Sequence, residues 1–500
     1  MTTAARKSRS LAELLAAAPP LAVHGRVDRP VTAVTADSRR LPAGGVFVAV
    51  RGTAADGHRF LAEAWRRGAA AVVVDREEVF RRESRQPANA GRTICLAADS
   101  RRTLAAMAAA WYGHPARSLQ LVGITGTNGK TTVAYLLECL LSRAGAGGVG
   151  VIGTVSYRWP GAEEPAANTT PGPEKLQQLL ARMVAAGVSY CVMEVSSHAL
   201  DQERVADLPF AVTVFTNLSH DHLDYHREME AYYQAKKKLF TGAWEAAAKI
   251  INRDDSWGAR LLAEAAPPKF SCSCRAAADY QVTELALSAA GSRFRLTAAG
   301  RNFSLATPLI GRFNVDNVLA AVAAADRLGC PLAAVGRELA RLPQVPGRLE
   351  RVPNDRRLHL FIDYAHTPDA LEKVLQALRE VAGAGRLLTL FGCGGDRDRQ
   401  KRPLMGRLAQ RYSDLVVVTS DNPRLEEPQA IIADILAGME VDGTVLVEPD
   451  RRRAIEKLLA ASRPGDLVLV AGKGHETYQE IGAEKIPFAD REVLREVLAA

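Results

Sequence analysis

The stretch GITGTNGKTT, from Gly123 to Thr132, decides the class of fold, because it lies between an apolar segment (119–125) and a helical one. A glycine-rich turn between a strand and a helix is the setting of a phosphate loop, whose backbone N–H groups and helix dipole bind phosphate oxygens. The sequence therefore predicts a nucleotide-binding α/β unit. The helical face that follows consists of Val133, Leu136, Leu137, Leu140 and Leu141.

This loop differs from the strict P-loop pattern, which has a glycine where this chain has Ile124. Its context still predicts that Lys130 contacts the β- and γ-phosphates of a nucleotide and that Thr131 binds Mg²⁺. A tight glycine turn without a ligand is the alternative, and the Gly-Lys-Thr-Thr sequence disfavours it.

Apolar segments alternate with helical ones along the 500 residues, which predicts an α/β protein of three domains. An N-terminal domain is expected over 1–112, a central P-loop domain with a mostly parallel sheet over 113–343, and a third domain over 344–500. The expected strands are 46–50, 70–74, 93–97, 119–125, 149–155, 190–195, 210–217, 248–252, 358–365, 386–394, 414–422, 444–449 and 466–472.

Four strands of the third domain end in unusual polar loops. Ligands of an open parallel sheet bind outside the carboxyl ends of its strands, so these loops predict a ligand site. The loops are DYAHTPD (363–369), GCGGDRD (392–398), SDNPR (420–424) and AGKGHE (471–476).

Carboxylate and imidazole groups follow two strands of the central domain. Glu194 lies in the apolar strand 190–195, where a carboxylate is costly unless it is paired or bound to a metal. Three histidines and two aspartates occur within 218–226. Zinc is one interpretation, but the phosphate loop favours Mg²⁺ that serves a nucleotide. For Asp221 and Asp224 a capped polar helix start is the alternative.

Composition narrows the function classes. Lys and Arg number 64 against 56 Asp and Glu, and aromatic residues make up 6%, which suits anionic small molecules and argues against nucleic acid. Seven scattered cysteines indicate reduced thiols. Apolar runs fall short of the roughly 20 residues of a membrane span, and Glu13 and Pro19-Pro20 interrupt a signal-like start, so a cytoplasmic location is expected.

Motifs spread over the whole chain resemble those of the Mur ligase family, ATP-dependent amide-forming synthetases of peptidoglycan assembly. Asp421-Asn422-Pro423-Arg424 resembles the motif of members that add meso-diaminopimelate to UDP-N-acetylmuramoyl-L-alanyl-D-glutamate. The other motifs are GTNGKTT (126–132), NTTP (168–171), MEVSSHAL (193–200), TNLSHDHLDYH (216–226), YYQAKKKLF (232–240), GRFNVDN (311–317), PGRLE (346–350), DYAHTPDAL (363–371), GCGGDRD (392–398) and GKGHE (472–476).

The resemblance implies an N-terminal domain that holds the UDP end of the substrate, a central ATPase domain and a Rossmann-like C-terminal domain that brings the amino acid. It implies ATP and Mg²⁺ as cofactors. The γ-phosphoryl group is expected to pass to the D-glutamyl side-chain carboxylate, and the amine of diaminopimelate to attack the acyl phosphate. A monomer without nucleic-acid or membrane partners is expected.

The resemblance carries site residues over position by position. Lys130, Glu194, His222 and Lys236 are implied as catalytic residues, and Thr131, Glu194, His222 and Lys236 as metal ligands. Nucleotide contacts are implied for Gly126, Thr127, Asn128, Gly129, Lys130, Thr131, Thr132, Asn314, Asn317, Arg348 and Asp363. Substrate contacts are implied for Ser38 (UDP-sugar), for Asn168, Thr169, Thr170, Ser196, Gln202 and Arg204 (muramoyl dipeptide), and for Arg397, Asp421, Asn422, Pro423, Arg424, Gly472 and Glu476 (diaminopimelate).

Lys236 belongs to a run of three lysines that composition alone assigns to a solvated helix face. The resemblance reverses this interpretation and implies that Lys236 is carbamylated. An ammonium beside Mg²⁺ would repel it, whereas addition of CO₂ creates an anionic oxygen ligand.

The implied amino-acid pocket agrees with the chemistry of diaminopimelate. Arg397 and Arg424 are expected to clamp its distal carboxylate, and Asp421 or Glu476 to accept from its distal ammonium. Gln400 departs from the glycine that is usual in the family.

Three other functions compete with this one. L-Lysine as the added amino acid would need no clamp for a distal carboxylate, and the NTTP and SSHAL segments disfavour a folylpolyglutamate synthetase. A nucleotide-binding scaffold without ligase activity is disfavoured because Lys130, Glu194, His222 and Lys236 are all present.

Overall fold

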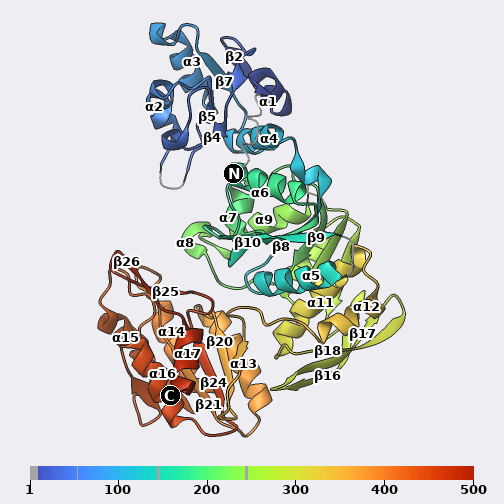
Figure 1. Ribbon diagram of the computed structural model, residues 1–500, viewed down its shortest axis with the longest axis vertical. Helices are drawn as coiled ribbons and strands as arrows, with labels where there is room; N and C mark the ends of the chain where they lie inside the picture. Colours follow the sequence, from blue (N-terminus) through green and yellow to red (C-terminus); the bar gives the residue numbers. More distant parts are fainter. Residues whose placement is uncertain (1–8, 53–54, 144–146, 242–245, 500) are drawn as a thin grey trace.

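The structure is a computed structural model and describes residues 9–52, 55–143, 147–241 and 246–499. Three α/β units follow one another along the chain, each built on its own main sheet (Figure 1). No helix among the described residues is long and apolar enough to cross a membrane.

The N-terminal unit is a five-stranded sheet of order β2-β7-β6-β5-β4, parallel except at β2. Apolar residues pack on both of its faces, Leu14 and Leu104 in one cluster and Leu61 and Val79 in the other. Its strands are β2 (Ala22–His24), β4 (Val34–Thr35), β5 (Val46–Val48), β6 (Ala71–Val74) and β7 (Thr93–Leu96), and β1 (Arg9–Ser10) pairs with β3 (Pro30–Val31). Its helices are α1 (Leu11–Ala17), α2 (Leu61–Arg66), α3 (Glu77–Arg85) and α4 (Ser100–Tyr112).

The central unit is an eleven-stranded sheet of order β11-β10-β9-β12-β8-β13-β14-β15-β16-β17-β18. Its middle, from β9 to β16, is parallel, as the alternation predicts. The strands are β8 (Gln120–Thr125), β9 (Gly148–Ile152), β10 (Ser156–Trp159), β11 (Ala162–Pro165), β12 (Val188–Glu194), β13 (Phe210–Phe215), β14 (Ala248–Asn252), β15 (Lys269–Ser273), β16 (Tyr280–Ser288), β17 (Gly291–Ala298) and β18 (Arg301–Thr307).

Helices cover both faces of this sheet. The predicted apolar face of the helix after the phosphate loop is buried in one core cluster, together with Val318 and Val322 of the central helix α11. Leu176 and Leu179 pack in the cluster on the other face. The helices are α5 (Lys130–Arg143), α6 (Pro173–Ala185), α7 (Ser197–Asp201), α8 (Leu223–His226), α9 (Met229–Lys237), α10 (Ser256–Glu264), α11 (Arg312–Arg327) and α12 (Leu332–Leu339).

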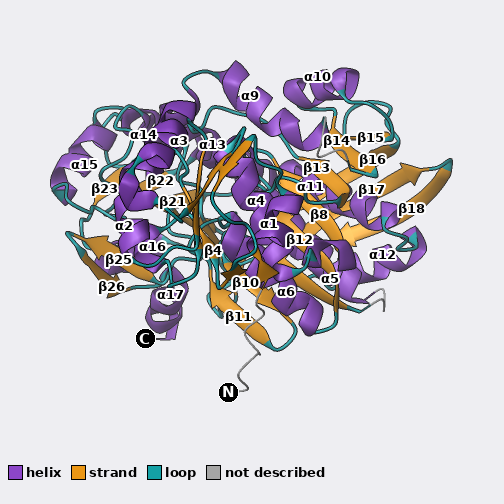
Figure 2. Cartoon of the chain, turned by 90° about the horizontal axis from the view of Figure 1, so that it is seen from above, coloured by secondary structure: helices purple, strands orange, loops and turns teal. Residues whose placement is uncertain are grey.

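The C-terminal unit is a six-stranded sheet of order β19-β20-β24-β21-β22-β23, parallel except at β19. Figure 2 shows its sheet between α13 and α14 on one side and α16 and α17 on the other. The strands are β19 (Glu350–Val352), β20 (His359–Asp363), β21 (Leu387–Phe391), β22 (Leu415–Val418), β23 (Val445–Val447) and β24 (Leu467–Ala471), with a hairpin of β25 (Tyr478–Ile481) and β26 (Glu484–Pro487). The helices are α13 (Pro368–Ala382), α14 (Lys401–Tyr412), α15 (Pro428–Leu436), α16 (Arg451–Ala461) and α17 (Asp490–Ala499).

Candidate active site

The loop between β8 and α5 curls around the side chain of its own lysine. Lys130 Nζ donates to the carbonyl oxygens of Gly126 and Thr127, at 2.8 Å each. Burial lowers the pKa of Lys130. Gly129 has φ +87, and a Cβ there would lie 2.2 Å from Asn317 Oδ1. The backbone of this loop therefore needs glycine at this position, as a phosphate loop does.

The segment after β13 holds the loop in place. Thr216 Oγ1 donates to the carbonyl oxygen of Asn128 at 2.6 Å, and Asn128 N donates to Asn217 Oδ1 at 3.0 Å. Thr127 N donates to the carbonyl oxygen of Asn217 at 2.9 Å. The neighbouring strand thus fixes the loop before any phosphate binds.

Glu194, at the end of β12, is buried beside this loop. Its Oε2 accepts from the hydroxyls of Thr131 and Thr154, both at 3.0 Å, and its Oε1 accepts from Thr154 N at 3.0 Å. Carboxylate and hydroxyl oxygens are the ligands that Mg²⁺ prefers in proteins. The oxygens of Thr131 and Glu194 therefore fit the predicted metal.

His222 and Lys236 both lie close to Tyr232. The His222 ring is 6.1 Å from the Tyr232 ring and 5.0 Å from the His198 ring, and its Nε2 lies 3.5 Å from Asp221 Oδ2. Burial lowers the pKa of His222. Lys236 Nζ lies 4.6 Å from the centre of the Tyr232 ring. These contacts place both predicted ligands around one aromatic ring.

Lys236 is 1% exposed, so the composition-based interpretation of a solvated lysine is wrong for it. Its ammonium donates to the carbonyl oxygen of Gly126 at 2.8 Å, the same oxygen that Lys130 contacts. Burial and the nearby Lys130 lower the pKa of Lys236 well below its usual value. The adjacent lysines face acidic side chains instead, Lys237 Nζ lying 2.9 Å from Glu264 and Lys238 Nζ 3.5 Å from Glu203.

A cavity of about 210 Å³ adjoins the phosphate loop between the central and C-terminal units. Asn314 contacts the lining residue Asn317, from whose Nδ2 its Oδ1 accepts at 3.2 Å. The volume and position suit part of a nucleotide. Six of the predicted nucleotide contacts line this cavity, namely Asn128, Gly129, Thr132, Asn317, Arg348 and Asp363.

Arg348 and Asp363 bring the C-terminal unit to the phosphate loop. Arg348 Nη2 donates to Thr131 Oγ1 at 3.4 Å, and its guanidinium lies 5.0 Å from the Tyr364 ring. Asp363 accepts from Leu349 N at 2.6 Å, and burial raises the pKa of Asp363 to about 6. Asp363 thereby shapes the turn that carries Arg348.

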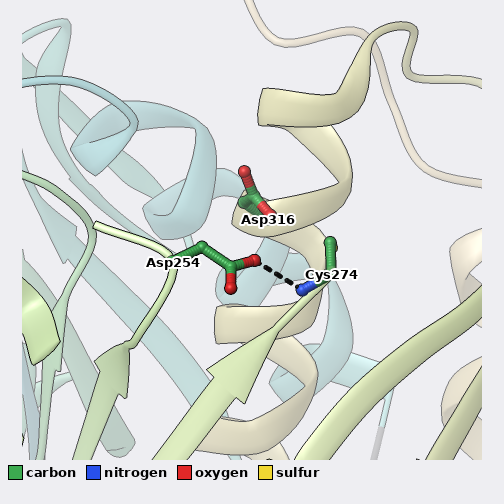
Figure 3. Close-up of side chains that lie close together, drawn as sticks. All are labelled: Asp254, Cys274 and Asp316. Carbon is green, nitrogen blue, oxygen red and sulfur yellow. Dashed lines mark hydrogen bonds between the residues drawn. The ribbon is translucent and has the colours of Figure 1, made fainter. Parts of the chain in front are cut away.

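One wall of the cavity carries Asp254 and Asp316, close to Cys274 (Figure 3). Asp254 Oδ2 accepts from Cys274 N at 2.7 Å, and Asp316 projects from α11. Burial raises the pKa of Asp316 to about 6 and that of the Cys274 thiol far above its usual range. Asp254 and Asp316 therefore give this wall of the cavity a polar, acidic surface.

The residues predicted to hold the muramoyl dipeptide form one network next to Glu194. Thr170 Oγ1 donates to the carbonyl oxygen of Glu194 at 2.8 Å and accepts from Ser196 N at 3.0 Å. Arg204 donates to the carbonyl oxygen of Thr170 at 2.9 Å and to Gln202 Oε1 at 2.7 Å. Two further members are Thr169, whose Oγ1 lies 3.1 Å from Thr154 Oγ1, and Asn168, whose carbonyl oxygen accepts from Tyr157 at 2.5 Å.

Ser38 stands apart from this network. It lies in the N-terminal unit, where its buried hydroxyl donates to Glu63 Oε2 at 2.7 Å.

Two of the polar loops of the C-terminal sheet meet after β22 and β24. Gly472 has φ +111, and a Cβ there would lie 2.5 Å from Asp421 Oδ2. Asn422 Nδ2 donates to Glu476 Oε2 at 2.8 Å. Burial raises the pKa of Asp421. The convergence of these loops, which the strand pattern predicts, is therefore present.

The two predicted arginines flank Gly394. A Cβ on this glycine would lie 3.0 Å from Arg424 Nη1 and 3.8 Å from Arg397 Cγ. Arg424 donates to the carbonyl oxygen of Gly395 at 2.6 Å and to Glu480 Oε2 at 3.1 Å, whereas Arg397 is exposed. Arg424 is thus anchored and Arg397 reaches solvent. Pro423 lies in the turn beside Arg424, where its carbonyl oxygen accepts from Glu426 N at 3.0 Å.

Three residues at the site are not among those that the sequence predicts. Thr154 has no motif of its own, whereas Asp369 and Lys473 lie inside the segments DYAHTPDAL and GKGHE. Asp369 Oδ2 accepts from Asn128 Nδ2 at 2.8 Å and from Ser219 Oγ at 2.7 Å. A charged residue within a motif is the signal that the sequence offers for Asp369 and Lys473.

The phosphate loop, the buried carboxylate beside it and a second parallel sheet whose loops face the nucleotide cavity define a nucleotide-using enzyme of cooperating α/β domains. Family models match along the chain: "Mur ligase family, catalytic domain" at 30–112, "Mur ligase middle domain" at 124–325 and "Mur ligase, glutamate ligase domain" at 347–474. The chain belongs to the Mur ligase family.

Curated relatives match over nearly their full length. The UDP-N-acetylmuramoyl-L-alanyl-D-glutamate--2,6-diaminopimelate ligase of Gloeobacter violaceus is 46% identical over 473 residues, 94% of this chain and 94% of the relative. The protein of the same name from Geobacter sulfurreducens is 45% identical over 504 aligned positions, 96% of this chain and 97% of the relative.

Solved structures of related ligases have a similar fold. The structure of a UDP-N-acetylmuramoyl-L-alanyl-D-glutamate--2,6-diaminopimelate ligase superposes with a TM-score of 0.71 at 32% identity, covering 99% of each chain. A folylpolyglutamate synthase of Mycobacterium tuberculosis complexed with ADP reaches a TM-score of 0.60 at 21% identity over 73% of this chain and 90% of that chain, which shows a shared fold.

Proposed function

We propose that this chain joins an amine of meso-2,6-diaminopimelate to the D-glutamyl side-chain carboxylate of UDP-N-acetylmuramoyl-L-alanyl-D-glutamate, with cleavage of ATP to ADP and phosphate. The observation that carries this proposal is the meeting of the DNPR loop (421–424) with the GKGHE loop (472–476) at one edge of the C-terminal sheet. The near full-length similarity to ligases of that name supports it.

The phosphoryl-transfer step uses the central unit. Lys130 and the N–H groups of its loop bind the β- and γ-phosphates, and the Arg204 and Ser196 network orients the D-glutamyl carboxylate. An oxygen of that carboxylate bonds to the γ-phosphorus as the bond to ADP breaks. Mg²⁺, held by Thr131, Glu194, His222 and carbamylated Lys236, would neutralise charge on the phosphoryl oxygens.

The amide-forming step uses the C-terminal unit. The amine nitrogen bonds to the acyl carbon, the acyl carbon–oxygen bond breaks, and inorganic phosphate leaves while the amine loses a proton. The polar loops 421–424 and 472–476 hold the amino acid so that its amine faces the acyl phosphate. Catalysis is mainly positioning and charge neutralisation.

Carbamylation of Lys236 belongs to this proposal. Because burial and Lys130 lower the pKa of Lys236, they favour its uncharged amine, the form that reacts with CO₂. The product is an anion placed beside the cationic Lys130 and near the proposed metal position.

Recognition of diaminopimelate is assigned to Arg397 and Arg424 for the distal carboxylate, and to Asp421 or Glu476 for the distal ammonium. Because Arg424 is already held by Glu480, it forms the fixed side of the clamp and exposed Arg397 the adaptable side. Ser38 is assigned to the UDP-sugar. We also propose domain limits at 1–112, 113–343 and 344–500, a monomer, and a cytoplasmic place of action.

The test is phosphate release by the purified protein with ATP, Mg²⁺ and UDP-N-acetylmuramoyl-L-alanyl-D-glutamate. Parallel reactions receive meso-diaminopimelate, L-lysine or no amine. We expect release that depends on diaminopimelate. Release with lysine instead would contradict the pocket assignment, and no release with any amine would leave a nucleotide-binding scaffold as the function.

A further inference from the structure

Lys473 is a fully buried cation in the 472–476 loop that follows β24, and its ammonium faces the 421–424 loop on the other side of the proposed amino-acid pocket. A buried ammonium is costly unless hydrogen bonds and opposite charges compensate it. Its Nζ donates to Asn422 Oδ1 at 3.1 Å and to Glu476 Oε2 at 3.2 Å, and it lies 3.9 Å from Asp421 Oδ1. All three partners are residues assigned above to the pocket.

These contacts fix the orientation of the Asn422 side chain. Its Oδ1 accepts from Lys473 Nζ and also from Glu480 N at 3.0 Å. Its Nδ2 therefore points to the other side, where it donates to Glu476 Oε2 at 2.8 Å. Without the ammonium, one acceptor bond of the amide would be lost, and the amide would be freer to turn.

Lys473 also sets the charge of the pocket. Asp421 and Glu476 are two carboxylates from different loops that both lie near its ammonium. Unscreened, they would repel the carboxylate that diaminopimelate brings at its distal centre. The ammonium of Lys473 offsets part of the negative charge of Asp421 and Glu476. The pocket can therefore bind both the distal carboxylate and the distal ammonium of diaminopimelate.

The backbone beneath these side chains is held separately. Arg451, fully buried, donates to the carbonyl oxygens of Ala471 at 3.0 Å and of Ser420 at 3.4 Å, and pairs with Asp490 at 2.7 Å. Ala471 and Ser420 immediately precede Gly472 and Asp421. Arg451 thus fixes the backbone where both loops begin, whereas Lys473 contacts the side chains of the loops.

We propose that Lys473 is a positioning residue that makes the pocket selective for an amino acid with a zwitterionic distal centre, by orienting Asn422 and balancing the carboxylates of Asp421 and Glu476. This inference rests on the proposed function, and it adds a determinant of selectivity to the four residues of the DNPR segment.

The experiment compares Lys473→Met, Lys473→Arg and the wild type in phosphate release with varied diaminopimelate. Loss of the ammonium should raise the KM for diaminopimelate at least about tenfold. It should also lower the ratio of kcat/KM for diaminopimelate to that for lysine, while the KM for ATP stays within about twofold. Lys473→Arg keeps the charge and should give an intermediate KM.

The control is Lys485→Met. Lys485 is exposed and lies 4.1 Å from the same Tyr478 ring that Lys473 approaches to 5.8 Å, so the two lysines differ in their contact with the pocket. Its kinetics should match the wild type. Stabilisation of each variant by ADP in a thermal-shift measurement establishes that the nucleotide site is folded.

An unchanged KM for diaminopimelate in Lys473→Met, or equal increases in the KM for all three substrates, would overturn the inference. If Lys473→Met does not fold, Lys473→Arg decides by the same KM comparison. If the wild type uses a different amino acid, the proposed function fails by that result alone. The comparison is then made with the amino acid that it uses, and an unchanged KM would again overturn the role of Lys473.

Discussion

The ammonium groups of Lys130 and Lys236 both donate to the carbonyl oxygen of Gly126, each at 2.8 Å. Two cations that share one acceptor repel each other, and burial increases the cost of keeping both charged. The pKa of Lys236 lies well below its usual value for these reasons. Burial lowers the pKa of Lys130 as well, and the nearby Lys130 adds to the effect on Lys236.

Replacement of Lys236 by alanine should lower kcat at least about 100-fold, because the proposed carbamate oxygen ligand is lost. A high concentration of a short carboxylic acid should partly restore activity by supplying a carboxylate in the vacated space. Steady-state phosphate release measures both effects. In the wild type loaded with ¹³C-bicarbonate, NMR should show a carbamate signal that the variant lacks.

The matched control is Lys237→Ala, one position along the same helix. Lys237 faces Glu264 at 2.9 Å, away from the phosphate loop, so this variant should keep near wild-type turnover. Equal losses in the two variants, or a carbamate signal that persists in Lys236→Ala, would contradict the assignment.

Gly129→Ala should raise the KM for ATP at least about tenfold, because the new methyl group would strain a residue at φ +87 and displace Asn317 from the cavity. Gly187→Ala is the comparison, since Gly187 has φ +73 but no atom within 4 Å of the place where an alanine Cβ would lie. Both variants should lose stability, and Gly187→Ala should bind ATP normally. Calorimetric titration with ADP distinguishes them.

Arg424→Ala should raise the KM for diaminopimelate at least about tenfold and leave ADP affinity within about twofold, because the fixed side of the clamp is removed. Exposed Arg495 offers a control in the same unit. Wild-type kinetics with diaminopimelate in Arg424→Ala would refute the role given to the DNPR segment.

The stability of the C-terminal unit should depend on pH through Glu426. The fully buried guanidinium of Arg402 donates to both carboxylate oxygens, at 3.0 and 2.8 Å, and holds the pKa of Glu426 at about 2, against 4.5 without these contacts. The unfolded state therefore binds more protons between these pH values, so the stabilisation is complete above pH 4.5 and is lost as pH falls toward 2.

Glu426→Gln should lower the free energy of unfolding at pH 7 by about 3 kcal/mol, and the difference from wild type should shrink at about pH 3. Urea denaturation at the two pH values measures this. Glu496→Gln, which removes the partner of exposed Arg452, should cost less than about 1 kcal/mol. A pH-independent difference for Glu426→Gln would disprove the coupling.

Much of the fold follows from local pattern. The apolar runs predict most strands of the parallel cores, because a strand covered on both faces must be apolar throughout. β15 (Lys269–Ser273) and β16 (Tyr280–Ser288) could not be found this way, since polar residues interrupt the first and exposed and buried residues alternate in the second. The hairpin of β25 and β26 is mostly exposed and leaves no apolar signal.

Local sequence also predicts one part of the candidate site and misses another. Glycines and charged residues at strand ends predict the phosphate loop and a ligand site at the polar loops of the C-terminal sheet without any alignment. Burial of Lys236 and Lys473 is a tertiary property, because a lysine is expected at the surface until the packed partners around it are known. Thr154 acts through a bond to Glu194, 40 positions away, and no local pattern encodes that pairing.

The hydrogen bonds that Asp369 accepts from Asn128 and Ser219 have a consequence for how the two ligand sites are coupled. A carboxylate of one domain is bound to the phosphate loop of another, next to the place where polyphosphate brings negative charge. Lys373 Nζ, 2.9 Å from the same Asp369 oxygen, offsets part of that charge, and a nucleotide in the loop is expected to alter these contacts between the two domains. By thermodynamic reciprocity, an amino acid that favours one docked arrangement changes nucleotide affinity by the same factor. Asp369 thus offers a route by which nucleotide and amino acid influence each other's affinity, to the same degree in both directions.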